Sequence, residues 1–500
     1  MMEKKVCAFV YNNCKNDARV LKEAKTLANA GYQMRIIALL DKDTVPYEQR
    51  DGFEIIRVEK NPIHYRILKA IRYPFWLVKL VVLKIMGVLF QLYERIIIGK
   101  TNKTKGEDSD ECLKTKLRQH QQSIKSKGLN GYYRHHWKHR KTILFLLLAL
   151  TGWALPLFLV AGIIGIVFRT IYEGIRKALL VFHKPLCYYD FRSNCLKIVK
   201  KEPADFYHGH DLHALPAAVA AWRKTGGKVI YDSHELYTEI SVLTPLERKV
   251  YRWYEKNIVP KVDGVITVNE SIAEELSKRY QIKKPVVLMN CPVTVGEIDH
   301  TSGNLLKEKA GITENKPIIL YQGAFHPNRG LQNLVKSAQY IDEAIIVFMG
   351  WGKLEEELKA LVVDGGLEDK VKLIGPVPQH EVLNYTKGAD VGAIPYQFIG
   401  LNNYYTSPNK LFDYINTEVA VVGSDFPELK RFIEGYEIGK TFNPESPQSI
   451  ADAINYVIAD PSRLQQMKEN TKKAAIIYNW EEESKKLLNL YKELQNGIVV

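Results

Sequence analysis

Residues 317–331 read PIILYQGAFHPNRGL, which has the pattern of a strand, a glycine loop and the start of a helix. An apolar, strand-like run ends at Gly323, and Gly330 opens a helix that contains Leu334. Such a loop turns its backbone N–H groups toward an anion, and Arg329 adds further donors. A glycine turn with a purely structural role would have the same pattern, so other parts of the chain must decide between the two interpretations.

Strand-like apolar runs recur on both sides of this stretch. Toward the C-terminus they are Ile345–Met349, Val371–Ile374, Val391–Pro395 and Val419–Gly423. Toward the N-terminus, a strand, a helix and two more strands fill residues 7–58, and further runs follow at Ala204–His208, Lys228–Asp232 and Gly264–Asn269. Two series of alternating strands and helices predict an α/β protein with two Rossmann-like lobes that face each other across a cleft.

The domain boundaries follow from these two series. With 500 residues and 46% hydrophobic content, the chain is globular and too long for a single core. We expect an N-terminal lobe of residues 1–60 and 186–295, an insertion at 61–185 and a C-terminal lobe at 296–479. The charged amphipathic helix at 480–497 is expected to pack back on the N-terminal lobe.

The predicted insertion contains the whole excess of positive charge. The chain has a net charge of +14, but residues 60–184 hold 23 Lys/Arg against six Asp/Glu, which leaves the remainder at −3. Residues 143–168 are 26 consecutive positions without a charge, or about 39 Å of helix. A basic charge confined beside a long apolar run indicates a membrane-associating helical insertion, on an anionic surface, more than a nucleic-acid groove.

Both ends of this insertion return to the same lobe, so the number of membrane crossings must be even. A two-span helical hairpin would export residues 99–142 with their twelve Lys/Arg, which the positive-inside rule disfavours. We therefore expect a monotopic, re-entrant or in-plane arrangement of residues 67–185, bent near Pro156, at the cytoplasmic face of the inner (plasma) membrane. The hairpin and a buried core helix are the alternatives.

Cysteine usage and the N-terminus favour a reducing compartment. The six cysteines have no C-x-x-C spacing, so neither a disulfide framework nor a zinc site is expected. The apolar run Cys7–Tyr11 is too short for the core of a signal peptide, and we expect it to form the first buried strand.

Two further segments of the C-terminal lobe follow expected strands. Gly350 and Lys353 lie in the loop after the second strand. Ser407 precedes a helix on which Lys410 and Asp413 are three residues apart and can share one face. A lysine there can bind a phosphate, and a carboxylate can accept hydrogen bonds from two vicinal hydroxyls. An ordinary surface ion pair would have the same spacing.

In the N-terminal lobe, polar side chains follow two strands. His208, His210 and Asp211 lie at the carboxyl end of one strand, where open α/β sheets bind their ligands. The next strand ends in the polar run Asp232–Glu235. Several histidines in one segment suggest a metal, but no further cluster stands at ligand spacing, so we expect no metal site.

In this order and spacing, the segments resemble the retaining family-4 glycosyltransferases of GT-B fold. Asp17–Ala24 is similar to the family's acceptor-side helix, and His208–Asp211 to its His-x-His-Asp segment. Gly323–Gly330 is similar to its donor-phosphate loop, and Ser407–Tyr414 to its Pro-x-Lys-x-x-Glu-Tyr helix start. The likeness covers nearly all of the chain outside the insertion. It implies transfer of a sugar from a nucleotide-sugar donor with retention of anomeric configuration, without a metal or another cofactor.

The resemblance also implies roles for individual residues. Those expected in catalysis are His210, Asp211, Arg329 and Lys410. Those expected to bind the donor are Gly323, Arg329, Gly330, Gly350, Lys353, Pro376, Val377, Tyr405, Ser407, Lys410, Leu411 and Asp413. Those expected on the acceptor side are Asp17, Arg19, His208, His234 and Glu235. Within these sets, Arg329 and Lys410 would bind the diphosphate, and Asp413 would bind the ribose.

Two positions depart from the family pattern. Tyr405 stands where the first glutamate of the family's E-x7-E pair belongs, and Ala324 stands where an arginine often contacts phosphate. The donor sugar's hydroxyls must then be bound by another group, such as Asn402, Asn403 or a backbone amide. More of the phosphate charge then falls on Arg329 and Lys410.

The expected function is transfer of a sugar from a nucleotide-sugar donor to a lipid-linked saccharide acceptor at the membrane, in bacterial surface polysaccharide assembly. We expect no nucleic-acid partner. Two alternatives remain open: a GT-B sugar-nucleotide epimerase, and a non-catalytic membrane-bound scaffold with a degenerate donor site.

Overall fold

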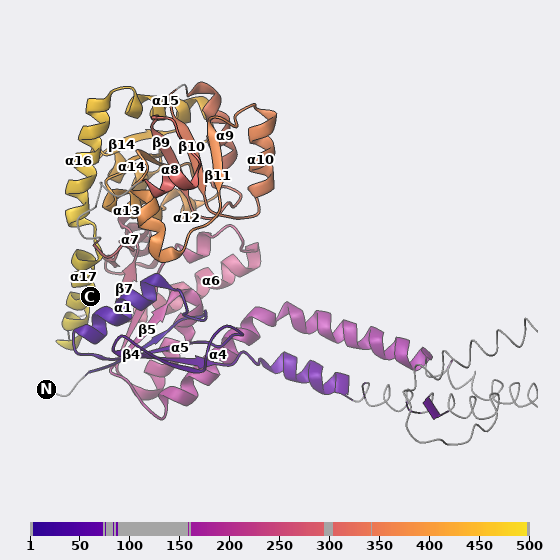
Figure 1. Ribbon diagram of the computed structural model, residues 1–500. Coiled ribbons are helices and arrows are strands. Elements are labelled where there is room, and N and C mark those ends of the chain that lie inside the picture. Colours follow the sequence, from indigo (N-terminus) through magenta and orange to yellow (C-terminus); the bar gives the residue numbers. More distant parts are fainter. Residues whose placement is uncertain are drawn as a thin grey trace, which may run out of the picture. The chain divides into compact units, whose positions relative to one another are not determined.

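The computed structural model (Figure 1) describes residues 4–73, 76, 84, 87–88, 159, 162–294, 304–341 and 343–497. The chain divides into two compact units, one of residues 1–60 and 191–500, and the other of residues 61–190. The first unit contains two α/β lobes, each with its own sheet. The second unit begins where the insertion was expected to begin and ends five residues beyond its expected end at 185.

The N-terminal lobe is built on an eight-stranded sheet in the order β3-β4-β2-β1-β5-β6-β7-β8, parallel except for the pair β3 and β4. Its strands are β1 (Lys5–Phe9), β2 (Gln33–Leu39), β3 (Tyr47–Arg50), β4 (Phe53–Val58), β5 (Phe206–His210), β6 (Lys228–Ser233), β7 (Gly264–Thr267) and β8 (Val286–Val287). The central strands are buried on both faces, which explains why their sequences are continuous apolar runs.

Helices cover both faces of this sheet. The N-caps of two of them, α1 and α7, lie on the side of the N-terminal lobe that faces the C-terminal lobe. The helices are α1 (Ala18–Asn29), α4 (His183–Val199), α5 (Asp211–Thr225), α6 (Pro245–Ile258) and α7 (Glu270–Tyr280), with the 3₁₀ turns η1 (Tyr237–Glu239) and η2 (Val259–Lys261). Asp17 caps α1 by accepting from the Val20 N–H, and Asn269 caps α7 by accepting from the Ile272 N–H. Capping therefore fixes both polar side chains at the edge of the lobe.

The C-terminal lobe is built on a six-stranded parallel sheet in the order β11-β10-β9-β12-β13-β14. The strands are β9 (Ile318–Gln322), β10 (Ile345–Met349), β11 (Val371–Ile374), β12 (Val391–Ile394), β13 (Ala420–Ser424) and β14 (Gly439–Phe442). The α-helices are α8 (Leu305–Lys309), α9 (Leu331–Ser337), α10 (Glu355–Asp364), α11 (Val382–Thr386), α12 (Leu401–Tyr404), α13 (Asn409–Asn416), α14 (Pro427–Ile433), α15 (Pro447–Ile458) and α16 (Pro461–Ile477), with 3₁₀ turns η3 (Ala338–Tyr340) and η4 (Gln379–Glu381).

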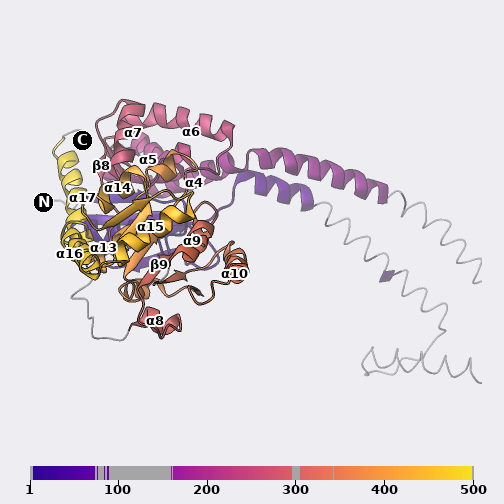
Figure 2. The ribbon, with the colours of Figure 1, turned by 90° about the horizontal axis from the view of Figure 1, so that it is seen from above.

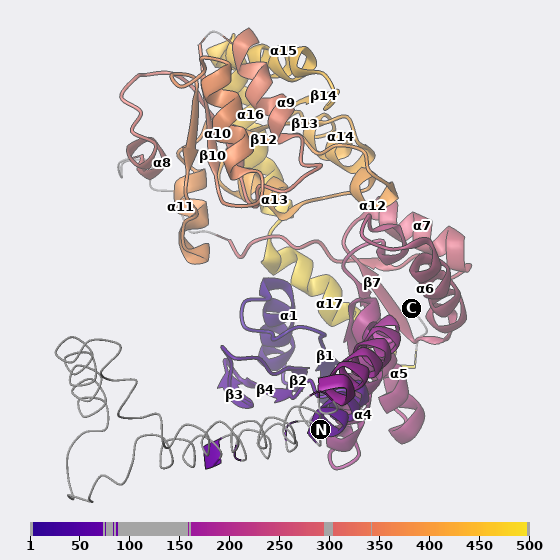
Figure 3. The same cartoon turned by 90° about the vertical axis from the view of Figure 1, so that its right-hand side faces the viewer.

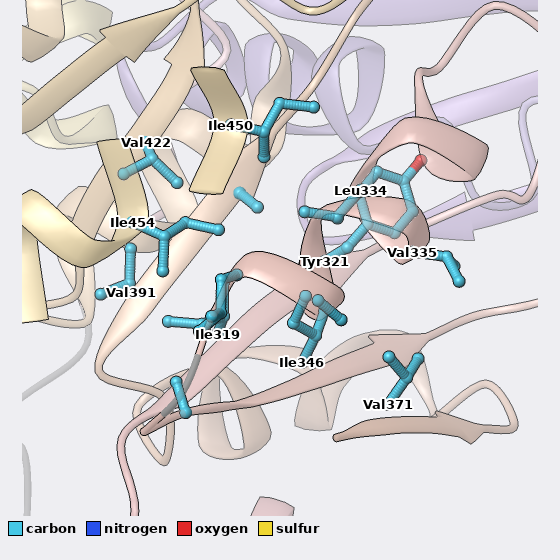
Figure 4. Packing of buried hydrophobic residues seen from close by; sticks show 14 of the residues in the cluster. Ile319, Tyr321, Leu334, Val335, Ile346, Val371, Val391, Val422, Ile450 and Ile454 are labelled. Carbon is cyan, nitrogen blue, oxygen red and sulfur yellow. The ribbon is translucent and has the colours of Figure 1, made fainter. Parts of the chain in front are cut away.

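One core cluster of this lobe lies between the sheet and two of its helices (Figure 4). Ile319 and Val422 from the strands pack with Leu334 of α9 and with Ile450 and Ile454 of α15, and all five are fully buried. The packing holds β9 and α9 at a fixed distance and angle. The loop that joins them therefore has a rigid frame.

The last helix, α17 (Trp480–Gln495), returns to the N-terminal lobe (Figure 3). Leu487 and Leu490 of α17 join the apolar cluster that contains Val6 and Ile36 of the N-terminal sheet. The Trp480 indole N–H also donates to the Thr26 hydroxyl at 3.0 Å. The C-terminal end of the chain therefore packs against the first lobe.

The described part of the second unit is helical at residues 63–73, 162–181 and 183–190, and the last of these segments is the start of α4. Several large apolar side chains of residues 162–171 are exposed, among them Ile163, Ile166 and Ile171. Among the described residues, no helix combines the length and the apolar character that a membrane crossing requires. The basic stretch 99–142 and most of the uncharged stretch 143–168 lie outside the described residues.

Candidate active site

A cleft of about 670 Å³ lies between the two lobes of the first unit. The predicted residues that line it are Asp17, Arg19, His234 and Glu235 from the N-terminal lobe, and Gly323, Arg329, Gly350, Pro376, Val377, Ser407, Lys410 and Asp413 from the C-terminal lobe. Most of them follow the carboxyl ends of strands or precede helix starts, which is where open α/β sheets bind their ligands. The cleft therefore joins the sequence segments that were predicted to form one site.

Glycines shape the loops of the C-terminal wall. Gly330 has φ +67°, and a Cβ on it would lie 1.8 Å from the Pro395 carbonyl oxygen. A Cβ on Gly350 would lie 1.9 Å from the Gly323 carbonyl oxygen. Side chains at these positions would clash with backbone, so only glycine lets the loops after β9, β10 and β12 pack together. The glycines thus have a structural role, and Gly323 and Gly350 also line the cleft.

Two cations of this wall lie against aromatic rings. The Lys410 Nζ is 3.6 Å from the centroid of the Tyr321 ring, and the Arg329 Cζ is 4.1 Å from that of Tyr396. Burial and the neighbouring Arg329 hold the pKa of Lys410 well below its usual range, although Asp413 opposes this. Among the ion pairs of the described residues, none includes either cation. The expected alternative of a surface ion pair between Lys410 and Asp413 is therefore wrong.

Asp413 is held by an amide instead of by a cation. The Gln322 side-chain N–H donates to Asp413 Oδ2 at 2.9 Å, and the side-chain Oε1 of Gln322 accepts from the Thr386 hydroxyl at 2.6 Å. Burial raises the pKa of Asp413 to about 6, although the Gln322 hydrogen bond and the charges of Lys22 and Lys410 favour its ionised form. The carboxylate is thus oriented, and it faces the cleft with little compensating charge.

The N-terminal wall contains a buried network centred on Asp232. The Arg19 guanidinium donates to both carboxylate oxygens of Asp232, at 2.8 and 3.1 Å, and pairs with Glu23 at 3.0 Å. The His234 Nε2 lies 3.1 Å from Asp232 Oδ2, and the His210 Nδ1 lies 3.3 Å from the same oxygen. One carboxylate therefore positions an arginine and two imidazoles.

The protonation states within this network follow from its charges. Burial alone would lower the pKa of His234, but Asp211 and Asp232 outweigh it and raise that pKa to about 9. Burial would raise the pKa of Asp232, but Arg19 and His234 hold it well below its usual range. Burial and the adjacent Asp232 raise the pKa of Glu23 well above its usual range. Near neutral pH the network therefore contains a protonated His234 beside an ionised Asp232.

Seven predicted site residues do not line the cleft. His208 and His210 are buried; His208 Nδ1 lies 2.9 Å from the Tyr491 hydroxyl, and His210 contacts Asp232 and His234. Leu411 is in the core, Gly330 is packed under Pro395, and Lys353 is exposed outside the cleft. Asp211 lies 3.5 Å from His234, and Tyr405 accepts from the Asn269 amide through its carbonyl. Position after a strand did not reveal that the side chains of His208, His210 and Leu411 are buried in the protein.

Several cleft residues were not predicted from the sequence. Tyr321, Gln322 and Tyr396 provide the rings and the amide around the C-terminal wall, and Trp351 lines it with 58% of its surface exposed. Tyr396 follows β12 within two residues, so its place after a strand was the signal that could have identified it. The ring contacts of the two cations have no signal in the sequence, because they join distant segments.

Asn402, one of the residues expected to replace the family's first glutamate, connects the two lobes. Asn402 accepts from the Leu236 backbone N–H at 2.8 Å and donates to Glu235 Oε2 at 3.3 Å. Burial, followed by Asp211, raises the pKa of Glu235. A carboxyl group from one lobe and an amide from the other thus meet at the cleft.

Two side-chain groups of the described residues have metal-ligand composition. Glu23, His208, His210 and Asp232 bring their ligand atoms within 4.8 Å of one another, but Arg19 already supplies positive charge to both carboxyl groups. His64, His183 and Cys187 form the other group, in the second unit. There the Cys187 sulfur lies 3.8 Å from Nδ1 and 3.7 Å from Nε2 of His183. In the first group, Arg19 supplies the positive charge that a metal ion would otherwise supply.

Comparisons with known proteins identify the family of the chain. The family model described as "Glycosyl transferases group 1" matches residues 304–474, and the model described as "Glycosyltransferase Family 4" matches residues 152–296. The "D-inositol 3-phosphate glycosyltransferase" of Xylanimonas cellulosilytica is 22% identical over 47% of this chain and 58% of its own length. The "Amylovoran biosynthesis glycosyltransferase AmsK" of Erwinia amylovora is 31% identical over 48% of this chain and 63% of its own length. The chain thus spans less than two thirds of the length of these relatives.

A solved structure agrees in fold. The Anabaena protein Alr3699/HepE, solved in complex with UDP, superposes with a TM-score of 0.60 over 98% of this chain and 100% of its own, at 11% identity. This likeness confirms the expected two-lobed GT-B fold. Both family models describe glycosyltransferases, and together they cover more than half of the sequence. The chain therefore belongs to the group 1 glycosyltransferases.

Proposed function

We propose that this protein transfers a glycosyl group from a nucleotide-sugar donor to a lipid-linked saccharide acceptor at the cytoplasmic face of the plasma membrane, in the assembly of a bacterial surface polysaccharide. The observation that carries the proposal is the pair Arg329 and Lys410, two cleft cations that lie against tyrosine rings instead of carboxylates. A diphosphate would supply the missing negative charge. The complexes of the similarly folded HepE with UDP and with UDP-glucose support a nucleoside diphosphate sugar as donor.

In this proposal the C-terminal wall binds the nucleotide part of the donor. The diphosphate lies beside Gly323. A Cβ atom at this position would lie 3.6 Å from the Lys410 Nζ, so the absence of a side chain leaves space for a ligand next to the lysine. Asp413, oriented by Gln322, accepts hydrogen bonds from the ribose hydroxyls. Because α9 has only seven residues, most of the phosphate charge is neutralised by the two side chains and little by the helix N-terminus.

The proposed chemistry is a metal-independent transfer with retention of configuration. As the bond to the anomeric carbon breaks, the leaving diphosphate gains negative charge, which Arg329 and Lys410 stabilise. The acceptor hydroxyl attacks the anomeric carbon from the face that the diphosphate leaves, and the hydroxyl proton passes to the departing phosphate oxygen. The glycosidic bond to the acceptor therefore forms on the same face as the broken bond.

The N-terminal wall positions the acceptor and the transferred sugar. Asp17, Arg19 and His234 line the cleft on this side, and His210 holds its place through Asp232. We propose that Glu235, together with Asn402, binds the sugar's hydroxyls in place of the glutamate that Tyr405 replaces. Because Glu235 and Asn402 come from different lobes, they can bind the sugar together only while the Asn402 hydrogen bonds hold the two lobes in contact.

The lipid-linked acceptor and the membrane location rest on other features. Residues 143–168 contain no charge, and residues 99–142 contain twelve Lys/Arg. The relative from Erwinia amylovora is named for the biosynthesis of a polysaccharide, amylovoran. An acceptor on a lipid carrier would be delivered to an enzyme whose residues 67–185 contact the membrane surface.

The decisive experiment incubates membranes that contain the protein with a panel of radiolabelled UDP- and GDP-sugars and then extracts the lipids. We expect label in lipid with one donor, and none when Lys410→Met replaces the wild type. Label in lipid from no donor would contradict the lipid-linked acceptor. Conversion of the donor sugar without transfer would indicate an epimerase instead. Unchanged surface polysaccharide in cells that carry Arg329→Ala with Asp413→Ala would indicate a scaffold.

A further inference from the structure

We propose that α6 (Pro245–Ile258) lies flat on an anionic lipid surface, as a membrane contact within the first unit. This contact is separate from residues 67–185, and it depends on neither the proposed reaction nor the proposed acceptor. It rests on an apolar stripe, a set of cations and the way in which the helix is anchored.

The outer face of α6 has an exposed apolar stripe. Leu246, Val250 and Trp253 are 71%, 50% and 67% exposed. Their spacing of four and three residues places them on one side of the helix. Val242, in the turn before the helix, is 79% exposed. An exposed tryptophan within a contiguous apolar stripe marks an interaction surface more than a random surface position.

The inner face of the same helix is firmly held. Glu255 is fully buried and accepts a hydrogen bond from the Tyr231 hydroxyl at 2.9 Å. Ile258 is also buried. Thr244 and Glu247 form a capping box at the N-terminus. The stripe is therefore presented by a fixed helix, and its exposure does not arise from loose packing.

The charges of α6 select the partner. Lys249, Arg252 and Lys256 are exposed along one edge of the stripe. Arg252 pairs with Glu239 at 2.5 Å, and no ion pair of the described residues includes either lysine. The two acidic residues of the helix are occupied, since Glu247 caps it and Glu255 is buried. The exposed surface of α6 is thus apolar and cationic.

Anionic lipid fits this surface better than a protein groove does. Lipid headgroups are mobile and meet cations at any position along a helix edge, while tryptophan prefers the boundary between headgroups and chains. A protein groove would have to place acidic residues opposite Lys249 and Lys256 and leave the tryptophan an apolar pocket at the same time. In Figures 2 and 3, α6 lies beside α7 at the periphery of the lobe, where a surface can reach it.

The test measures amide hydrogen exchange of the full-length protein with and without vesicles. With vesicles of phosphatidylcholine and phosphatidylglycerol in equal parts, we expect exchange in residues 245–258 to slow, and with pure phosphatidylcholine to remain unchanged. Trp253→Glu should abolish this protection. The matched variant Val363→Glu, on α10 and 62% exposed in the wild type, should retain it.

Each outcome decides a different claim. Unchanged exchange in residues 245–258 on the anionic vesicles overturns the α6 proposal, even if residues 67–185 become protected, and a protein partner then becomes the better explanation of the stripe. Equal protection by both kinds of vesicle overturns the role of the cations. Protection of α6 without protection of residues 67–185 supports α6 and contradicts the proposed membrane contact of the insertion. Because no sugar nucleotide is added, the result is independent of glycosyl transfer.

Discussion

On the C-terminal wall of the cleft, Arg329 and Lys410 lie against tyrosine rings, whereas on the N-terminal wall Arg19 and His234 are held by carboxylates. Burial lowers the pKa of Lys410, but on the other wall Asp211 and Asp232 outweigh burial and raise the pKa of His234. The difference indicates what each wall is for. In the proposed function, the uncompensated cations bind an anionic ligand, whereas the compensated cations hold the N-terminal wall in a fixed arrangement.

The largest expected effect comes from breaking the compensated wall. Asp232→Asn leaves Arg19 and His234 without their shared counter-charge, so the free energy of unfolding should fall by about 3–5 kcal/mol. Denaturant titration near neutral pH measures this. Asp51→Asn is the control, because Asp51 pairs with Lys25 at the exposed surface and should contribute less than about 1 kcal/mol.

The pH dependence of stability distinguishes this network from simple loss of packing. The pKa of folded His234 is about 9, above its ordinary value of 6.5. Its contribution should therefore be complete below pH 6.5 and be lost as the pH rises through about 9. Asp232→Asn should weaken this dependence without removing it, because Asp211 still favours the protonated imidazole. If the stability difference between wild type and variant were the same at pH 6 and pH 10, the charge pairing would have no role.

Breaking the uncompensated wall should affect activity and spare stability. Lys410→Met removes a cation that meets the diphosphate, so kcat/KM for the donor should fall by about 10²–10³-fold. The Tm should not fall, because the variant buries no ammonium group. Lys440→Met, on the same lobe and half exposed, is the matched control and should behave as wild type. A large loss of Tm in Lys410→Met would contradict the comparison.

A smaller effect is expected at the carboxylate of the same wall. Asp413→Asn weakens hydrogen bonds to the ribose and should raise the KM for the donor by about 10–100-fold. In the wild type this KM should rise as the pH falls below about 6, where Asp413 gains its proton. The variant should lack that dependence. A pH profile of KM for both proteins measures it, and parallel profiles would exclude Asp413 as a donor ligand.

The folded-state pKa of Asp413 lies above its ordinary value of 3.8, so its ionised form opposes folding. Relative to Asp413→Asn, the wild type should therefore lose stability as the pH rises from about 4 to about 6. This is the opposite direction to an ion-paired carboxylate. It separates the two walls by a measurement that needs no substrate.

The smallest effect is expected where the two walls meet. Asn402→Ala removes two hydrogen bonds between the lobes, to the Leu236 N–H and to Glu235, and should lower kcat/KM about fivefold. The binding affinity should fall more for the intact donor than for the nucleoside diphosphate, because Asn402 and Glu235 are proposed to bind the sugar. Equal losses for both ligands would assign Asn402 to domain closure alone.

Much of the fold could be predicted from the sequence, because parallel strands that are buried on both faces must be continuous apolar runs. β9 and β10 are such runs, and the loops after them contain Gly323 and Gly350. The candidate site was only partly predictable. The spacing of Lys410 and Asp413 placed both on one helix, but their partners Tyr321 and Gln322 lie some ninety residues away in the chain.

The N-terminal wall was harder to predict for the same reason. Asp232 was visible as a strand-end residue, but its partner Arg19 comes from a helix 213 residues earlier. His210 stands at a strand end that faces the cleft, and its side chain turns inward to Asp232. Sequence periodicity indicates which face of a helix or strand is buried. It does not indicate whether a polar side chain lies in the cleft or inside the lobe, because that depends on charged residues from distant parts of the chain.

If Arg329 and Lys410 receive a nucleoside diphosphate, calorimetric titration of UDP and GDP should show binding without any sugar or acceptor. One of the two nucleotides should bind, and Lys410→Met should bind that nucleotide at least about 10²-fold more weakly, because the variant lacks one of the two cations that would neutralise the diphosphate. Binding of neither nucleotide, or equal affinity in Lys410→Met and the wild type, would contradict a diphosphate site at these cations.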